Sequence, residues 1–342
     1  MKEARFYKKL PQAFVQCTAC NRFCRIANNS TGFCRVRKNV DGTLYSLVYN
    51  KTLTLTADPI EKKPLFHFMP GTYCNSISTY GCNFSCPFCQ NHDISQDFIE
   101  KDIGAVQETT PEQIVENTIE RGLEGIAYTY VEPTVFIEYA IDTMKLAKKE
   151  KLYNVWVSNG YMSEQAIGEL AKYLDAANID LKGDAKFYKE LCGNANVEFV
   201  KKNIQLLYKK GVHVEVTNLI VPGYNDNADQ IREVASFVAS IDKNIVLHFS
   251  RFFPHYKMLD TPVTPLTTLR QAYSIAKQQG LHHVYLGNVP EAQNTYCPKC
   301  GSLVIEREGY TVMLLALDKR GRCKHCGYDL GIKVRESQRT SV

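Results

Sequence analysis

Short apolar runs alternate with longer amphipathic segments through the middle of the chain. The runs have the length of strands, and the segments between them have the periodicity of half-buried helices. Because each strand is followed by a segment of helical length, the pattern predicts a parallel sheet with right-handed crossover connections. The expected strands are 76–80, 125–130, 153–158, 176–181, 213–221, 245–250 and 282–287.

The helical segments carry start and stop signals as well as periodicity. In one of them Thr110 is the expected N-cap, Pro111 the first helical residue and Gln113 the partner that completes a capping box, before a stop near Gly122. Six or seven such units are too few for a closed eight-stranded barrel. We therefore expect an open partial (β/α)6 TIM-like barrel. The other expected helices are 134–151, one that starts at 163, a pair within 185–210, 228–240 and 265–280.

Three cysteines follow the first expected strand, in the stretch GCNFSCPFCQN. Cys82, Cys86 and Cys89 have the spacing C-x3-C-x2-C, and the ligand sites of such folds lie at the carboxyl ends of the strands. A closed structural metal site takes four protein ligands, so three thiols indicate a site with one open position. The alternative is a zinc site completed by Cys74 or His92.

The composition bears on how the cysteines are used. The chain has 44% apolar and 23% charged residues, as in ordinary globular proteins, and no run approaches the roughly 18 apolar residues of a membrane span. The N-terminal stretch MKEARFYKKLPQAF lacks the apolar segment of a signal peptide, so we expect a cytoplasmic protein. Structural disulfides are rare there, and the 13 cysteines indicate metal or redox chemistry.

Two further cysteine sets flank the central one. The N-terminal set has four thiols, which could hold a structural zinc ion or a second iron–sulfur cluster, and the spacing does not distinguish them. The C-terminal set forms two CxxCG knuckles on an expected β-ribbon, which is typical of a zinc-ribbon or rubredoxin-like module and favours zinc. The N-terminal set is Cys17, Cys20, Cys24 and Cys34, and the C-terminal set is Cys297, Cys300, Cys323 and Cys326.

The chain thus divides into an N-terminal four-cysteine module (1–70), a barrel (71–290) and a C-terminal module (291–342). The first module carries 12 Lys or Arg against 4 Asp or Glu, whereas the barrel carries 20 against 26. Basic flanks can indicate a nucleic-acid partner. However, a zinc ion held by four thiolates carries a net charge of about −2, which would cancel much of the flank charge. We therefore do not expect nucleic-acid binding.

The C-x3-C-x2-C motif after the first strand resembles that of the radical SAM superfamily. The resemblance implies that Cys82, Cys86 and Cys89 hold a [4Fe–4S] cluster whose fourth iron binds S-adenosylmethionine (SAM), and that Phe88 packs near the adenine. The open position would then belong to the cofactor.

Strand-end residues extend the resemblance. Glu132, in YTYVEPT, stands in the place of the family's G-G-E segment, although its two glycines are Tyr130 and Val131 here. Ser158 and Asn159, in VSNGY, are similar to the D-T-N-G of glycyl-radical activating enzymes. The resemblance implies that these residues contact SAM.

Two later strands continue the pattern. The stretch IDLKGD is similar to the D-L-K of the same enzymes, which implies that Lys182 pairs with the SAM carboxylate and that Asp180 orients it. The sixth strand ends in LHFSRFFPHYKM, which places Arg251 near the rim of the site.

Three longer stretches resemble the radical SAM proteins of the AmmeMemoRadiSam system, relatives of pyruvate formate-lyase activating enzyme. These are DPIEKKPLFHFMPGT, FCQN and HFSRFFPHYKM, and the resemblance covers most of residues 1–290. It implies reductive cleavage of SAM to a 5′-deoxyadenosyl radical, hydrogen abstraction from an unidentified substrate, a ferredoxin- or flavodoxin-type electron donor, and Memo-like and AMMECR-like partner proteins. A glycyl-radical activase and a non-catalytic, zinc-rich nucleic-acid-binding protein are the alternatives.

Overall fold

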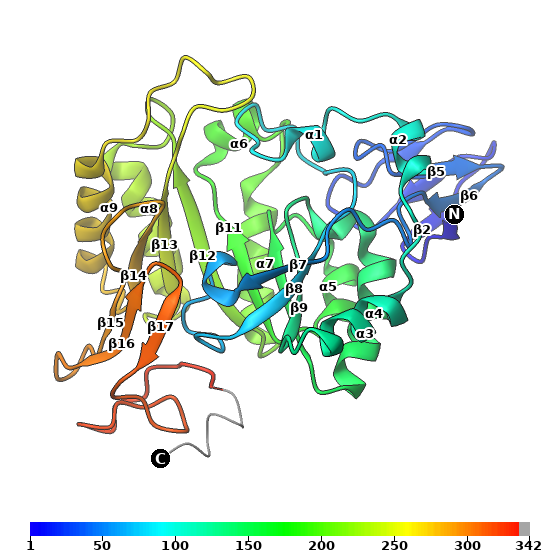
Figure 1. The fold of residues 1–342 in the computed structure, drawn as a ribbon. Coiled ribbons are helices and arrows are strands. Elements are labelled where there is room, and N and C mark those ends of the chain that lie inside the picture. Colours follow the sequence, from blue (N-terminus) through cyan, green and yellow to red (C-terminus); the bar gives the residue numbers. More distant parts are fainter. Residues whose placement is uncertain (335–342) are drawn as a thin grey trace.

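The computed structural model describes residues 1–334, and its centre is an eight-stranded sheet (Figure 1). Seven neighbouring strands run parallel, and β7 (Thr56–Pro59) pairs antiparallel with β8 at one edge. All seven expected strands are present, so the predicted α/β class is confirmed. The parallel strands are β8 (Tyr73–Ile77), β9 (Gly125–Tyr128), β10 (Tyr153–Ser158), β11 (Ala176–Asp180), β12 (His213–Ile220), β13 (Val246–Arg251) and β14 (Val284–Gly287).

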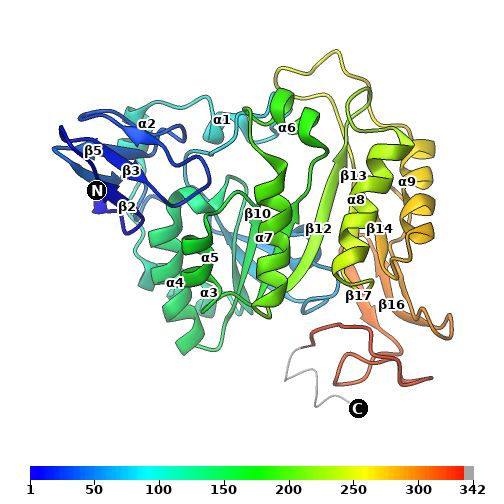
Figure 2. The same cartoon turned by 180° about the vertical axis from the view of Figure 1, so that it is seen from behind.

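Helices cover the outer face of this sheet (Figure 2). The first expected helix begins as predicted, because the Thr110 side chain accepts from Gln113 N and Gln113 reaches back to the Thr110 backbone. The sheet order ends at β14 and β7, which do not pair with each other in the described chain, so the barrel is open. The helices are α3 (Pro111–Glu120), α4 (Ile137–Lys149), α5 (Glu164–Leu170), α6 (Ala185–Leu191), α7 (Val197–Lys209), α8 (Ala228–Ile241) and α9 (Leu266–Gln278).

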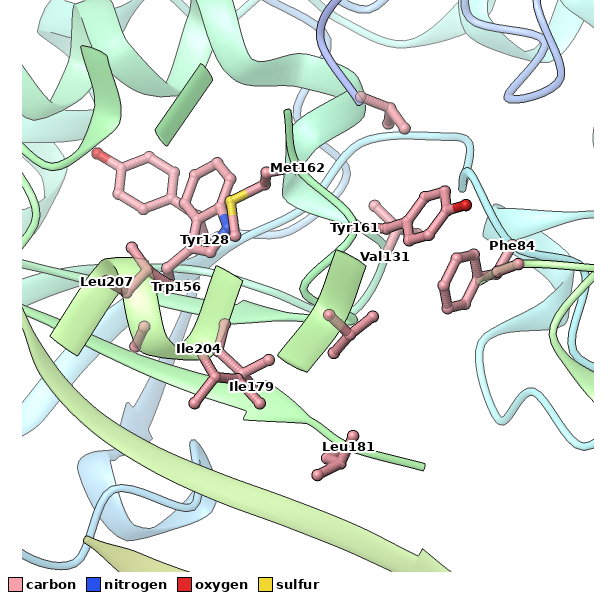
Figure 3. Close-up of a cluster of buried hydrophobic side chains, with 14 of the residues drawn as sticks. Phe84, Tyr128, Val131, Trp156, Tyr161, Met162, Ile179, Leu181, Ile204 and Leu207 are labelled. Carbon is pink, nitrogen blue, oxygen red and sulfur yellow. The ribbon is translucent and has the colours of Figure 1, made fainter. Parts of the chain in front are cut away.

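The main core lies between the sheet and these helices. Tyr128 on β9 and Trp156 on β10 are fully buried, with ring centroids 5.7 Å apart. Ile204 and Leu207 of α7 belong to the same buried cluster (Figure 3). The apolar runs of the strands therefore pack against the apolar faces of the helices, in which apolar residues recur every three to four positions. This is the packing that the periodicity predicts.

The concave side of the sheet is filled by the segment 60–72, which begins with the short helix η1 (Ile60–Lys62). The backbone N–H groups of Phe66 and His67 donate to the buried carboxylate of Glu215 on β12, at 3.0 and 2.7 Å. Pro64 O accepts from the Asn178 side chain at 2.7 Å. This segment occupies one end of the barrel interior and leaves the carboxyl ends of the strands open.

Two small antiparallel sheets form the N-terminal region. One has the order β1-β6-β5 and the other β2-β3-β4, and their apolar residues join the barrel core rather than a separate one. β7 lies within the expected N-terminal module (1–70) but pairs in the barrel sheet. The strands are β1 (Lys2–Glu3), β2 (Tyr7–Lys9), β3 (Val15–Cys17), β4 (Arg25–Ile26), β5 (Arg37–Val40) and β6 (Thr43–Ser46).

The C-terminal region is the expected ribbon. Strands β15 (Thr295–Tyr296), β16 (Leu303–Glu308) and β17 (Thr311–Leu314) form an antiparallel sheet with its own small core. Figures 1 and 2 show it at the lower end of the barrel, with the N-terminal sheets beside the upper end. Residues 335–342, which the expected C-terminal module includes, lie outside the described residues. No helix in residues 1–334 has the length and apolar character needed to cross a membrane.

Candidate functional site

A cavity of about 360 Å³ opens at the carboxyl ends of the parallel strands, within the roughly 300 to 1,000 Å³ typical of small-molecule sites. Loops that follow β8, β9, β10 and β11 supply most of its polar wall. The site residues expected from the sequence meet there, with one exception described below. Those that line the cavity are Cys82, Cys86, Phe88, Cys89, Glu132, Ser158, Asn159, Asp180 and Lys182.

The three thiols lie on the loop between β8 and the short helix α1 (His92–Ser95). Cys86 is buried, whereas Cys82 and Cys89 are partly exposed to the cavity. Cys82 Sγ lies 3.3 Å from Phe84 N, and Cys89 Sγ lies 3.3 Å from Ser95 Oγ. The loop backbone and the first turn of the adjoining helix therefore orient the thiols.

Neither candidate for a fourth protein ligand lines this cavity. Cys74 is fully buried on β8 with its Sγ 3.5 Å from Asp58 O. His92 Nδ1 lies 2.8 Å from Asp97 Oδ2, and its ring stacks on Tyr256 at 4.3 Å. Among the described residues, three thiols and no imidazole line the cavity. A fourth thiol, that of Cys192, is buried behind the wall in contact with Cys86 and does not line the cavity. The cavity wall therefore fits an open three-thiolate site.

The surroundings of the thiols affect how readily they ionise. Burial, followed by repulsion from the Glu132 carboxylate, raises the pKa of the Cys82 thiol well above its usual value. A buried thiol forms a thiolate ligand only beside compensating positive charge, which bound iron supplies. The donor set, three thiols beside an open cavity, fits an iron–sulfur cluster with three cysteine ligands.

Glu132 is the centre of a buried hydrogen-bond network beside the thiols. Its carboxylate accepts from Thr134 N at 3.1 Å, Ser158 Oγ at 2.9 Å and Asn159 N at 2.8 Å, and the Thr134 hydroxyl also donates to it. Burial nevertheless raises the pKa of Glu132, although these donors oppose the shift. Four donors occupy the lone-pair directions of a carboxylate, so Glu132 fixes the β10 turn as well as lining the cavity.

The Asn159–Gly160 turn brings an amide group next to the thiol loop. Asn159 Nδ2 donates to Asn83 Oδ1 at 2.7 Å and lies 4.0 Å from Cys82 Sγ. Gly160 has a φ of +73°, and a Cβ there would lie 2.7 Å from a methyl carbon of Ile179. The turn therefore needs glycine on both conformational and steric grounds.

Asp180 and Lys182 form an ion pair in the cavity wall at the end of β11. Lys182 Nζ lies 2.7 Å from Asp180 Oδ2 and 5.9 Å from the centroid of the Phe88 ring. Burial lowers the pKa of Lys182, but the Asp180 carboxylate and the neighbouring thiols outweigh it and raise that pKa above its usual value. Lys182 therefore presents a permanent positive charge to the cavity.

Arg251 is the exception among the expected site residues, because its side chain is not among those that line the cavity. Its Nε donates to Thr264 O at 2.8 Å, and its guanidinium lies 5.2 Å from the Phe253 ring centroid. Neighbouring side chains along a strand point to opposite faces, and it is Ser250 and Phe252 that line the cavity instead.

The cavity also contains residues that sequence reasoning had not assigned to it. Lys62, Lys63 and Tyr130 line it and share the Asp58 carboxylate, with contacts of 2.7, 2.7 and 2.6 Å. These donors outweigh burial and lower the pKa of Asp58. Tyr130 has a φ of +67°, which is unusual for a residue other than glycine. Two features of the sequence could have indicated these residues: the DPIEKK stretch, which contains Asp58, Lys62 and Lys63, and the replacement of a glycine of the G-G-E segment by Tyr130.

The C-terminal cysteines form a compact metal site. Cys297 and Cys326 have their sulfurs 3.5 Å apart, and those of Cys300 and Cys323 are 3.7 Å apart. All four sulfurs lie within 4.8 Å of one another. Zinc–sulfur bonds of about 2.3 Å in a tetrahedron place thiolates about 3.8 Å apart, so this geometry suits one tetrahedral ion. The predicted metal site is supported.

Comparisons with known proteins agree with this site. The Radical SAM superfamily model matches residues 76–238. The uncharacterized protein MJ0808 of Methanocaldococcus jannaschii is 46% identical over 336 residues, which cover 97% of this chain and 99% of that protein. The putative glycyl-radical enzyme activating enzyme MJ1227 of the same organism is 29% identical over 223 residues, or 62% of this chain and 86% of that protein.

An enzyme named as an activase is a more distant relative. The pyruvate formate-lyase 1-activating enzyme of Escherichia coli K12 is 23% identical over 218 residues, which cover 58% of this chain and 87% of that enzyme. The region matched by the superfamily model contains the thiol loop and the ends of β9 to β12 that line the cavity, whereas the cavity residues on β13 lie beyond it. The chain therefore belongs to the radical SAM superfamily, which implies a [4Fe–4S] cluster and SAM as cofactors, and it is distantly related to the enzymes that activate glycyl-radical enzymes.

Proposed function

We propose that the protein uses a [4Fe–4S] cluster held by Cys82, Cys86 and Cys89 to cleave SAM reductively and to abstract hydrogen from a substrate. The observation that carries this proposal is the shared cavity, in which three thiols face the polar strand ends and no other thiol or imidazole of the described residues lines the wall. When bound, the cluster supplies one electron to SAM, which yields a 5′-deoxyadenosyl radical.

The cavity wall suits the polar groups of SAM. Lys182 offers a positive charge for the carboxylate of the cofactor, and Asp180 holds that ammonium group at 2.7 Å. Ser158 and Asn159 lie beside Cys82, where the amino end of SAM would bind, and Glu132 holds both of them. Phe88 supplies an apolar face for the adenine.

Apolar side chains protect the reaction from water. Phe84, Phe252 and Phe253 line the cavity, and the first two are buried. Excluding water strengthens the electrostatic contacts that hold the cofactor, and the aromatic walls keep other C–H and S–H donors away from the radical, so that the bound substrate is the donor within reach.

The substrate and the partners are proposed from the three stretches that resemble the AmmeMemoRadiSam radical SAM proteins. Each stretch contributes to the cavity wall, through Lys62, Gln90 and Phe253 among others. We therefore assign substrate selection to these stretches. From the same resemblance we propose Memo-like and AMMECR-like proteins as partners, and a ferredoxin- or flavodoxin-type protein as the electron donor.

Anaerobic reconstitution tests this function. The full chain is loaded with iron and sulfide and reduced with dithionite in the presence of SAM, and 5′-deoxyadenosine is quantified. We expect cleavage by the wild type and none by Cys86→Ala. The matched control is Cys74→Ala, because Cys74 is a buried thiol outside the cavity. Zinc instead of iron at the central thiols, or SAM left intact by the reduced protein, would refute the proposal.

Activation of a glycyl-radical enzyme is the second candidate. It is favoured by the similarity to the two activating enzymes and by the strand-end stretches VSNGY and IDLKGD. This function requires a partner protein with a glycine loop. A glycyl-radical signal in the electron paramagnetic resonance spectrum of such a partner, after incubation with the reduced protein and SAM, would distinguish it from modification of another substrate.

A further inference from the structure

The four N-terminal cysteines surround a second cavity. Cys17 ends β3, and its N–H donates to Cys24 O at 3.0 Å, which brings two of the thiols to one side. Cys20 forms a bridge to Met162, and Cys34 lies just before β5. All four line the same cavity, together with residues from two other parts of the chain, Asn83 and the pair Thr134 and Val135.

The N-terminal sulfurs do not have the spacing of a single-ion site. In the described chain, the C-terminal set is the only group of three or more potential ligands that gathers closely enough for one metal ion. Within residues 1–334, close sulfur–sulfur contacts join pairs of C-terminal cysteines and none of the N-terminal ones. Thiolates bound to the corners of a [4Fe–4S] cluster lie further apart than those around one ion, because the inorganic core separates them.

Two buried hydrogen-bond donors line this cavity without a partner among the described residues. Arg37 is 2% exposed, and its two terminal nitrogens bind Glu138 at 3.1 and 2.5 Å, but its Nε has no acceptor. Asn83 is 1% exposed, and its Nδ2 also has none. Both residues line the cavity. Unsatisfied buried donors are costly, and the sulfur atoms of an iron–sulfur cluster accept N–H hydrogen bonds.

The cavity lies directly behind the central thiol loop. Gly81, next to Cys82, approaches the N-terminal region so closely that a Cβ there would lie 2.8 Å from Cys34 O. Asn83 follows Cys82 and lines the second cavity, whereas Cys82 lines the first. Arg22, from the N-terminal region, donates to Asn83 O at 2.6 Å. One short segment therefore separates the two cavities.

We propose that Cys17, Cys20, Cys24 and Cys34 hold a second [4Fe–4S] cluster rather than a zinc ion, with N–H groups of Arg37 and Asn83 directed at its sulfur atoms. Four thiolates complete the coordination of this cluster, so it has no open position for SAM. The proposal concerns metal content, and it does not depend on which reaction the central site performs.

Removal of the central thiols tests the proposal. The full-length variant Cys82→Ala/Cys86→Ala/Cys89→Ala is reconstituted anaerobically with iron and sulfide in the presence of zinc, and its iron, sulfide and zinc are measured. We expect about four irons and about four sulfides per chain, a broad visible absorption and a paramagnetic signal after reduction by dithionite. The wild type should hold about eight irons, and both proteins should hold one zinc ion at the C-terminal set.

A complementary variant keeps the central thiols. Cys20→Ala/Cys34→Ala should lose about half of the wild-type iron, whereas Cys74→Ala should keep all of it. The proposal would be overturned by a wild type with about four irons and two zinc ions together with a central-thiol variant without iron or sulfide. The central-thiol variant cannot cleave SAM, so its iron content separates a failure of this proposal from a failure of the proposed function.

Discussion

The polar residues of the central cavity are held by contacts with neighbouring strands. Ser158 on β10 donates to Glu132, which follows β9, and Asn159 reaches Asn83 in the thiol loop at 2.7 Å. Lys182 is held by Asp180 on the end of β11. Side chains whose rotamers are fixed in this way bind a cofactor without a large loss of conformational entropy.

Replacement of Lys182 by methionine should weaken SAM binding. The substitution keeps the length of the side chain and removes the charge that we assign to the cofactor carboxylate. A charge-assisted hydrogen bond contributes roughly 1.5–3 kcal/mol, so the dissociation constant for SAM should rise about tenfold to hundredfold. Equilibrium dialysis on the anaerobically reconstituted protein measures it.

The control for this prediction is Lys172→Met, because Lys172 forms an exposed pair with Glu169 at 2.8 Å, and such pairs contribute little. Unchanged SAM binding in Lys182→Met, with the iron content of the wild type, would contradict the role of Lys182.

At the scale of elements, the chain turns sharply into the site after β9 and after β10. The β10 turn contains Gly160 in a left-handed conformation, and its carbonyl accepts from Asn203 of α7 at 2.8 Å. The β9 turn contains Tyr130 with a positive φ. Strained turns place side chains where a regular strand could not.

Replacement of Gly160 by alanine should destabilise the protein and disturb the site. The added Cβ requires an unfavourable φ and would lie 2.7 Å from Ile179 Cγ2 and 3.0 Å from Val200 Cγ1. Strain of this kind costs on the order of 1–3 kcal/mol, and overpacking adds to it. Urea unfolding should show a lower free energy of unfolding, and 5′-deoxyadenosine formation should fall.

Gly168→Ala is the matched control. Gly168 lies inside helix α5, and a Cβ there would have no atom within 4 Å. Alanine is favoured over glycine in a helix by about 1 kcal/mol, so this variant should be slightly more stable than the wild type. The prediction for Gly160 fails if both variants unfold at the same urea concentration.

The expectations from the sequence differed from the structure at particular elements. The first strand was expected at 76–80, but β8 is Tyr73–Ile77, because its first residues pair with β7. Because that pairing joins segments separated in the sequence, the local pattern of apolar and polar residues does not indicate where β8 begins. Likewise, the N-terminal strands have only two to four residues, too few for a period-two pattern to be recognised. The six-residue strand β10 was predicted to the residue, and the long strands β12 and β13 to within one residue at each end.

At the scale of the whole molecule, the segment 60–72 joins the barrel to the C-terminal ribbon. Arg307 on β16 is buried, and it donates to Phe66 O at 2.8 Å and to Thr295 Oγ1 at 2.8 Å. Glu61 begins the same segment and accepts from Gly71 N at 2.9 Å. At the end of the barrel that segment 60–72 fills, buried polar contacts therefore join parts of the chain that are distant in the sequence.

Glu61 should make stability depend on pH. Its second carboxylate oxygen has no hydrogen-bond partner among the described residues, and burial raises its pKa to about 7, although Gly71 N and Arg307 oppose the shift. The folded state then binds a proton more tightly than the unfolded state. The contribution of Glu61 to the free energy of unfolding should therefore be lost as the pH rises from about 4.3, the usual pKa of the side chain, to about 7.

The test is urea unfolding of Glu61→Gln at pH 5 and pH 8. Glutamine keeps the acceptor for Gly71 and carries no charge, so the variant should be more stable than the wild type at pH 8, by roughly 1–3 kcal/mol. The difference should shrink at pH 5. Glu116→Gln, at an exposed position of α3, should show no such pH dependence, and an equal response of the two variants would contradict the assignment.

The sequence by itself determined the α/β class, the open three-thiol motif and the grouping of cysteines into three sets. These features are encoded locally, in apolar periodicity and in the spacing of neighbouring residues. Only the tertiary structure decided that Arg251 does not line the cavity, that Lys62 and Lys63 do, and that the N-terminal thiols lie behind Cys82. Such relations arise when distant segments pack together. The number of residues between two cysteines on separate loops does not determine the distance between their sulfurs.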